Sequence, residues 1–183
     1  MSNQPTTTAN NLAELVANAC LRWQAEELAG TNPSELPTRE DYLKCASWWL
    51  AGVDMSAVLG RIPAERVADI VAGNGIVAGC SKDAIEGFEA AVCEFLEAQE
   101  EGENAVNGAR LLKAYLDLGH DVEIQAQDWA EEQLNDALGA LNREVDITDL
   151  GGGYALLALA ADIAWGLFQY LAYSMAKRIE AEW

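Results

Sequence analysis

The sequence predicts an all-α protein: a compact multi-helix bundle or orthogonal array of about 6–8 helices around a long apolar C-terminal helix. Three observations support this. Apolar residues recur at helical spacing along most of the 183 residues. No stretch alternates apolar and polar residues for long enough to predict a strand. The longest apolar run, Tyr154–Arg178, follows three glycines and is apolar around nearly its whole circumference, which is typical of a buried central helix or a membrane span.

The C-terminal run is long enough to span a bilayer, but Asp162 lies near its middle. A carboxylate at that depth costs about 2.5–3.5 kcal/mol on insertion scales. We therefore expect a core helix, in which the carboxylate of Asp162 is hydrogen-bonded, protonated with a raised pKa, or paired with a basic residue. The candidate partners are Arg22, Arg61, Arg110 and Lys113.

Four helices are predicted in the first part of the chain, with boundaries at Gly, Pro and capping residues. Thr38 and Asp41 have the spacing of a capping box, which marks the start of the second helix. The stretch Gly73-Asn74-Gly75 predicts a turn after the fourth helix. The expected helix ranges are 10–29, 38–52, 54–59 and 63–72. Residues 1–10 are expected to form a flexible polar tail, and residues 11–183 a single domain.

Three more helices are predicted before the C-terminal one. Ser81 is a favourable N-cap for a helix that runs to about Glu101. Apolar residues at helical spacing define the next helix, for which Gly119 is expected to follow the C-terminus; these residues are Ala105, Ala109, Leu112 and Leu116. The last of the three is expected at 125–142, with an inward face made by Ala130, Leu134, Ala137, Leu138 and Leu141.

No motif for catalysis, a cofactor or a metal site is present in the sequence. His120 is the single histidine, and it follows a predicted helix end, where an imidazole caps carbonyl groups or stays solvated. Four cysteines form no CxxC pair and are expected to be buried free thiols; they are Cys20, Cys45, Cys80 and Cys93. We therefore predict a protein that is not an enzyme, with no cofactor and no metal, and without a signal sequence we expect it in the cytoplasm.

The net charge is −19, from 30 acidic and 11 basic residues. Such a surface repels nucleic acid and anionic membranes, and it attracts basic proteins. Five carboxylates of the helix after Ser81 form a stripe roughly 27 Å long, with one carboxylate per about 5–7 Å, a spacing of the same order as that of phosphates along a nucleic-acid strand. The helix at 125–142 carries a second stripe, where Trp129 fits the role of an interface anchor if it is exposed.

These stripes lead us to expect a non-enzymatic acidic binding protein. Its partner would be a basic, nucleic-acid-binding protein, for example a host defence enzyme that is inhibited by mimicry of nucleic-acid phosphates. One alternative is a helical enzyme or small-molecule binder with its site near Asp162. Another is an oligomeric scaffold, or an immunity-type partner of a basic toxin. The candidate contact residues are Asp83, Glu86, Glu89, Glu94, Glu97, Glu100, Glu101, Asp128, Trp129, Glu131, Glu132 and Asp136.

Overall fold

The computed structural model describes residues 9–139 and 145–183 of the chain. Within these residues there are six α-helices of twelve residues or more, the single-turn helix α3 and two 3-10 turns, but no strand, which confirms the all-α prediction. Residues 1–8 of the expected tail lie outside the described residues. The helices are α1 (Ala9–Glu27), α2 (Arg39–Leu50), α3 (Ser56–Leu59), α4 (Ala64–Gly79), α5 (Lys82–Glu100), α6 (Asn104–Ala137) and α7 (Gly153–Glu182), and the 3-10 turns are η1 (Pro33–Glu35) and η2 (Ile147–Asp149).

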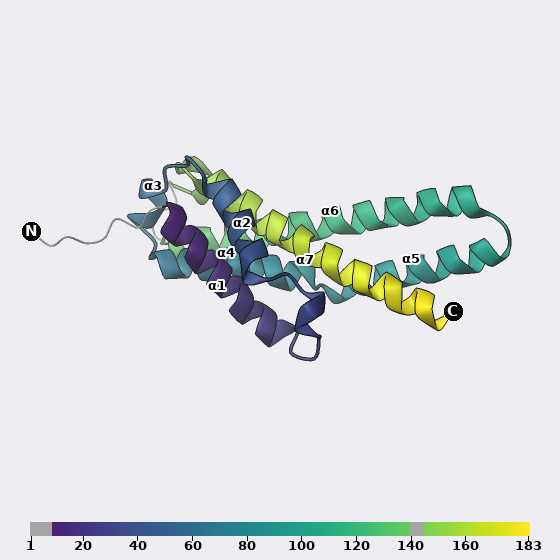
Figure 1. Ribbon diagram of the computed structural model, residues 1–183. Coiled ribbons are helices and arrows are strands. Elements are labelled where there is room, and N and C mark those ends of the chain that lie inside the picture. The colour runs from purple at the N-terminus through teal and green to yellow at the C-terminus, as the bar shows by residue number, and fades with distance from the viewer. Residues whose placement is uncertain (1–8, 140–144) are drawn as a thin grey trace, which may run out of the picture.

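The long C-terminal helix α7 is the centre of the fold, as the sequence predicts. It packs against α2, α4, α5 and α6, and α4 in turn packs against α1 and α6. Figure 1 shows an elongated molecule, with α1 to α4 gathered at one end and the hairpin of α5 and α6 projecting at the other. By length and composition α7 is also able to cross a membrane, and half of its most apolar 18-residue window is buried inside this fold.

The boundaries of two helices follow from their capping residues. Thr38 accepts a hydrogen bond from the backbone N–H of Asp41 at 3.3 Å, and the Asp41 carboxylate accepts one from the Thr38 N–H at 2.7 Å. This confirms the predicted capping box at the start of α2. At the start of α7, Gly152 has a left-handed backbone (φ 90°), which suits glycine and ends the preceding segment.

The predicted turn at Gly73-Asn74-Gly75 is wrong, because α4 continues through it to Gly79. The glycines serve helix packing instead of chain reversal. A Cβ on Gly75 would lie 2.6 Å from Ile163 Cγ2, and one on Gly79 would lie 2.7 Å from the carbonyl oxygen of Ala164. The backbones of α4 and α7 therefore approach each other more closely than any residue with a side chain would permit.

The predicted helix end at Gly119 is wrong for the same reason. The segment is one continuous helix of 34 residues, α6, in which both expected helices are joined. A Cβ on Gly119 would lie 1.6 Å from Cζ3 of Trp165, so the glycine makes room for this indole of α7. His120 consequently lies within a helix, exposed, and caps no helix end. Residues 140–142, including Leu141, lie outside the described residues.

The second half of α6 buries Ala130 and Leu134 as expected, whereas the first half packs inward through other residues than those that mark this helix in the sequence. Leu112 and Leu116 are 57% and 50% exposed, and the face that packs inward carries Leu111, Tyr115 and Leu118 instead. Tyr115 joins a layer of aromatic rings between α5, α6 and α7. Its ring centroid lies 5.8 Å from that of Phe88, 5.8 Å from that of Phe168 and 5.1 Å from that of Trp165. This layer connects the projecting hairpin to the central helix.

Candidate functional site

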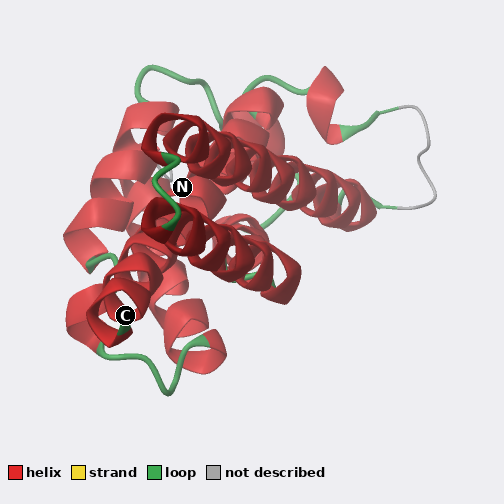
Figure 2. Ribbon diagram, turned by 90° about the vertical axis from the view of Figure 1, so that its right-hand side faces the viewer, coloured by secondary structure: helices red, strands yellow, loops and turns green. Residues whose placement is uncertain are grey.

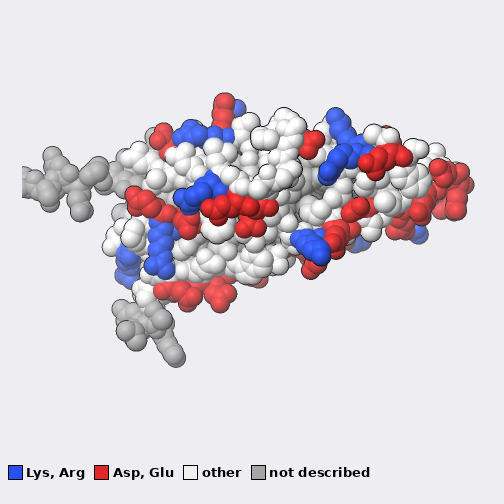
Figure 3. All heavy atoms as spheres, turned by 90° about the horizontal axis from the view of Figure 1, so that it is seen from below, with Lys and Arg blue, Asp and Glu red and all other residues white. Residues whose placement is uncertain are grey.

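The hairpin of α5 and the first part of α6 forms a projection that we call the acidic arm, residues 83–118. Residues 83–103 contain eight carboxylates and no basic residue. Figure 2 views the molecule from the tip of the arm, where α5 and α6 meet. In Figure 3 acidic atoms gather at the right-hand tip, whereas acidic and basic atoms alternate over the other end of the same face. Negative charge is therefore concentrated on the part of the molecule that reaches farthest from the core.

All seven predicted contact residues of the arm are exposed; six lie in α5, and Glu101 follows its last residue. Two of them have a basic neighbour, because Lys82 lies 3.6 Å from Glu86 and Arg110 lies 4.0 Å from Glu94. Among the described residues, no ion pair neutralises the other five; these are Asp83, Glu89, Glu97, Glu100 and Glu101. These carboxylates are accessible to solvent, and their role as contacts stays a prediction.

The second predicted stripe, on the C-terminal half of α6, is less uniform. Asp128, Glu132 and Asp136 are exposed, whereas Glu131 is half-buried. Trp129 is half-buried too and lines a hollow between α1, α4 and α6. The indole therefore does not project from the surface in the way that an aromatic anchor would, and the stripe has no equivalent of the projecting arm.

Asp162 of α7 has different partners from those expected. Its carboxylate accepts a hydrogen bond from Trp49 Nε1 at 2.8 Å and one from Cys45 Sγ at 3.2 Å, both from α2. The four proposed basic partners do not pair with it. Arg22 pairs with Asp69, Arg110 with Glu94 and Lys113 with Asp117, while Arg61 is exposed between α3 and α4. This confirms the expectation that the carboxylate is hydrogen-bonded. The prediction that a basic residue pairs with it is wrong.

Two hollows lie on either side of Asp162. One, of about 240 Å³, is lined by Trp49, His120, Glu123 and Gln127. Burial raises the pKa of Glu123, and the nearby Asp162 carboxylate raises it further, while His120, whose Nδ1 lies 4.0 Å from the Glu123 carboxylate, acts in the opposite direction. Two carboxylates thus face a partly buried space in which His120 is the basic group on the wall.

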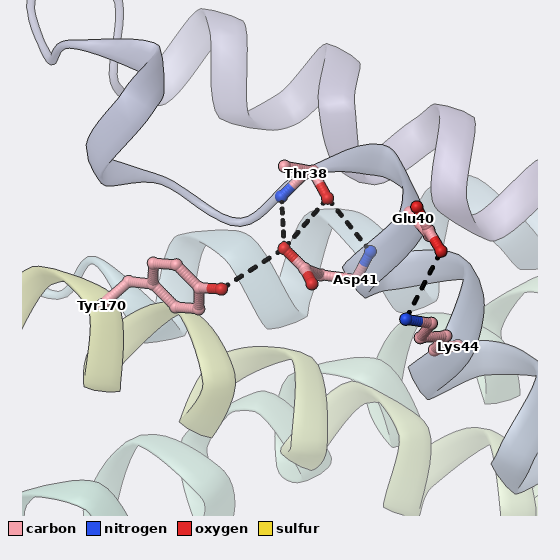
Figure 4. Close-up of polar contacts among 5 residues, drawn as sticks. All are labelled: Thr38, Glu40, Asp41, Lys44 and Tyr170. Atoms are coloured by element: carbon pink, nitrogen blue, oxygen red, sulfur yellow. Dashed lines mark hydrogen bonds and ion pairs between the residues drawn. The ribbon is translucent and has the colours of Figure 1, made fainter.

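The second hollow beside Asp162, of about 150 Å³, is lined by Asp41, Cys45 and Tyr170 among others. Figure 4 shows how Tyr170 reaches from α7 to Asp41 at the start of α2; its hydroxyl donates a hydrogen bond to the carboxylate at 3.3 Å. The backbone hydrogen bond from Thr38 lowers the pKa of Asp41, so this group is a carboxylate at neutral pH. Burial, with Asp162 as a further cause, raises the pKa of Cys45, which keeps its thiol protonated.

Among the described residues there is no group of three or more His, Cys, Asp or Glu side chains that could hold a metal ion. All four cysteines are free; Cys20 is buried and the other three are half-buried. Burial raises the pKa of Cys80 to about 11, so this thiol also stays protonated at neutral pH.

No family model matches this chain, and no curated protein or solved structure matches it either.

Proposed function

We propose that the protein is a non-enzymatic acidic binding protein whose arm occupies the basic surface of a nucleic-acid-binding protein. The observation that carries this proposal is the run of eight carboxylates without a basic residue in 83–103, exposed on a projecting hairpin. Helices tolerate like charges at these spacings only at a cost in stability. A surface that retains them, with few basic neighbours, is consistent with selection for the electrostatic field that they produce.

The mechanism that we propose is competition. Carboxylates along the arm take the place of phosphates on the partner's basic surface, and the partner is then unable to bind nucleic acid. A host defence enzyme that acts on nucleic acid is one such partner, and the proposal includes a cytoplasmic location. An immunity-type interaction with a basic toxin would use the same surface, and the identity of the captured protein distinguishes the two.

The test is an affinity capture from host-cell lysate at low and high salt, followed by mass spectrometry. The expected result is one basic nucleic-acid-binding protein that is captured at low salt, lost at high salt and displaced by double-stranded DNA. A variant with Gln at four unpaired positions of the arm should lose this capture; the positions are Glu89, Glu97, Glu100 and Glu101.

A matched control variant removes four exposed carboxylates outside the arm: Glu26, Glu27, Glu65 and Glu180. Both variants change the net charge from −19 to −15, because four of the 30 acidic residues become neutral. Loss of capture in the arm variant alone supports the proposal. Equal capture by the wild type and the arm variant would contradict it, and equal loss in both variants would reduce the interaction to unspecific charge attraction.

A second candidate function is small-molecule binding beside Asp162, favoured by the hollow of about 240 Å³ that Glu123 and Asp162 share. Because both carboxylates are partly buried, a small organic cation would relieve their mutual repulsion. Calorimetric titration with putrescine tests this candidate. Glu123→Gln should weaken binding while Glu132→Gln, an exposed neighbour on the same helix, should not, and equal effects would rule the site out. A scaffold function, the third alternative, would appear in the same samples as a concentration-dependent molecular mass.

A further inference from the structure

A further hollow lies between α1, α4 and α6, separate from the acidic arm and from Asp162. Its volume is about 340 Å³, within the range of roughly 300–1,000 Å³ that is typical of small-molecule pockets. Two indoles, those of Trp23 and Trp129, form part of its walls. Its polar groups include the carboxylate of Asp69 and the side-chain amides of Asn74 and Gln133. An apolar aromatic wall with a few fixed polar groups is the usual composition of a ligand site.

The wall that Trp23 forms is held in place from two directions. Its Nε1 donates a hydrogen bond to the Asp69 carboxylate at 2.9 Å, and Arg22 pairs with the same carboxylate. On the other side the indole lies against the backbone of α4, since a Cβ on Gly73 would be 2.7 Å from its Cε2 atom. The ring therefore has its position before any ligand arrives, which lowers the entropic cost of binding.

The buried amide of Asn74 is also held in place, and it contacts the amide of Gln133, which is exposed. Asn74 is only 7% exposed; its Nδ2 donates to the carbonyl oxygen of Ile70 at 2.8 Å, and its Oδ1 accepts a hydrogen bond from Gln133 Nε2 at 3.3 Å. The second amide hydrogen of Asn74 and the side-chain oxygen of Gln133 have no hydrogen-bond partner among the described residues. The hollow thus offers an unused donor and an unused acceptor on neighbouring, connected side chains.

We propose that this hollow binds a purine base of the adenine type, as the free base or the nucleoside. Indole rings stack on any nucleobase. The unused donor of Asn74 and the unused acceptor of Gln133 match the N7 acceptor and the N6 amino donor on one edge of adenine. A nucleotide fits less well. The described lining residues include no basic side chain, the Arg22 guanidinium is held by Asp69, and the net charge of −19 repels phosphate.

Calorimetric titration of the full chain with adenine, adenosine and AMP tests the proposal. Adenine or adenosine should bind saturably, and AMP should bind at least about fivefold more weakly, because its phosphate enters a negative field. Removal of a stacking indole by Trp129→Ala should weaken binding by about 5- to 150-fold. Gln133→Ala, which removes one edge contact, should weaken it by about fivefold or more.

Trp48→Ala is the matched control, because this indole is 70% exposed on α2 and does not line the hollow. It should leave the affinity unchanged, and circular dichroism confirms that each variant is folded; if Trp129→Ala does not fold, Gln133→Ala decides. The inference is overturned if neither adenine nor adenosine binds at millimolar concentration. It is also overturned if AMP binds as tightly as adenosine, or if the Trp48 and Trp129 variants lose affinity equally. The four-Gln arm variant should bind adenosine normally, so this test does not depend on the proposed function.

Discussion

The two ends of the molecule are both helical but differ in how closely their helices pack and in how much charge they expose. At the end formed by α1, α4 and α7, glycines let helices approach one another closely, as Gly75 and Gly79 do against α7. In the acidic arm α5 packs on α6, a layer of aromatic rings connects the hairpin to α7, and the eight carboxylates of residues 83–103 are exposed. Close packing stabilises the first end, whereas repulsion between like charges on the arm costs stability.

The largest effect is expected from removal of Phe168, whose ring lies in the aromatic layer between the two ends. Phe168 is fully buried, and its centroid lies 6.1 Å from those of Phe88 and Trp165. Phe168→Ala should lower the free energy of unfolding by about 3–5 kcal/mol, because it opens a cavity in the aromatic layer. Urea denaturation measures this loss, and amide hydrogen exchange should show α5 losing protection before α4 does.

Leu112→Ala is the control for that experiment. Leu112 is an apolar residue of the arm, but it is 57% exposed, and its truncation should change the free energy of unfolding by less than about 0.5 kcal/mol. A similar loss of stability in both variants would mean that the arm contributes a core of its own, and the division between the two ends would be wrong.

Glycine substitutions compare the packing at the two ends of the molecule, with intermediate effects expected on the free energy of unfolding. Gly79→Ala places a methyl group 2.7 Å from the carbonyl oxygen of Ala164, a backbone atom with little room to move. We expect a loss of about 1–3 kcal/mol in the free energy of unfolding. Gly108→Ala in the arm meets no heavy atom within 4 Å and should instead stabilise the protein by about 0.5–1 kcal/mol, because alanine favours the helix.

Thermal unfolding of both glycine variants, with urea denaturation to give free energies, measures these opposite signs. If Gly79→Ala were neutral, α4 and α7 would have to separate without cost, contrary to the close packing of their backbones. If Gly108→Ala were destabilising, the start of α6 would be packed more tightly than its exposure indicates.

The same contrast explains which features could be predicted from the sequence. Local signals were reliable: the Thr38–Asp41 capping box and the start of the apolar helix after the three glycines depend only on neighbouring residues. Glycines within helices mislead a prediction from sequence, because their role depends on a helix far away in the chain. Gly75 makes room for Ile163 of α7, and Gly119 makes room for Trp165 of the same helix. A glycine in a helical pattern indicates either a helix end or a close packing contact, and only the tertiary structure distinguishes them.

The candidate sites follow this rule as well. Exposed carboxylates such as Glu97 could be predicted, because charged residues of an amphipathic helix face solvent. The inward face of α6 could not, because its first half carries two apolar stripes, one with Leu112 and one with Tyr115, and periodicity does not say which faces the core. The hollow between Trp23 and Trp129 joins three helices that are distant in sequence, and the sequence indicates it only through the position of Trp129 on a polar face.

The smallest expected effect is electrostatic, and it tests the arm directly. Glu97 lies three or four positions from Glu94, Glu100 and Glu101, and the last turn of α5 contains no basic residue. Glu97→Gln should therefore raise the free energy of unfolding by a few tenths of a kcal/mol at low ionic strength, through relief of repulsion between neighbours and with the helix dipole. Thermal unfolding should show this gain in stability at about 10 mM salt and its loss at about 1 M salt, because salt screens surface charges.

Glu86→Gln is the control for the arm, since Glu86 has Lys82 as a neighbour at 3.6 Å. Its neutralisation removes an attraction together with a repulsion, so the free energy of unfolding should stay constant or fall slightly. Equal stabilisation by both substitutions would show that the gain comes from the global charge of −19 and not from the unpaired carboxylates near the tip. The arm would then be no more strained than the rest of the surface, and its concentration of charge would lose its value as an argument for a binding surface.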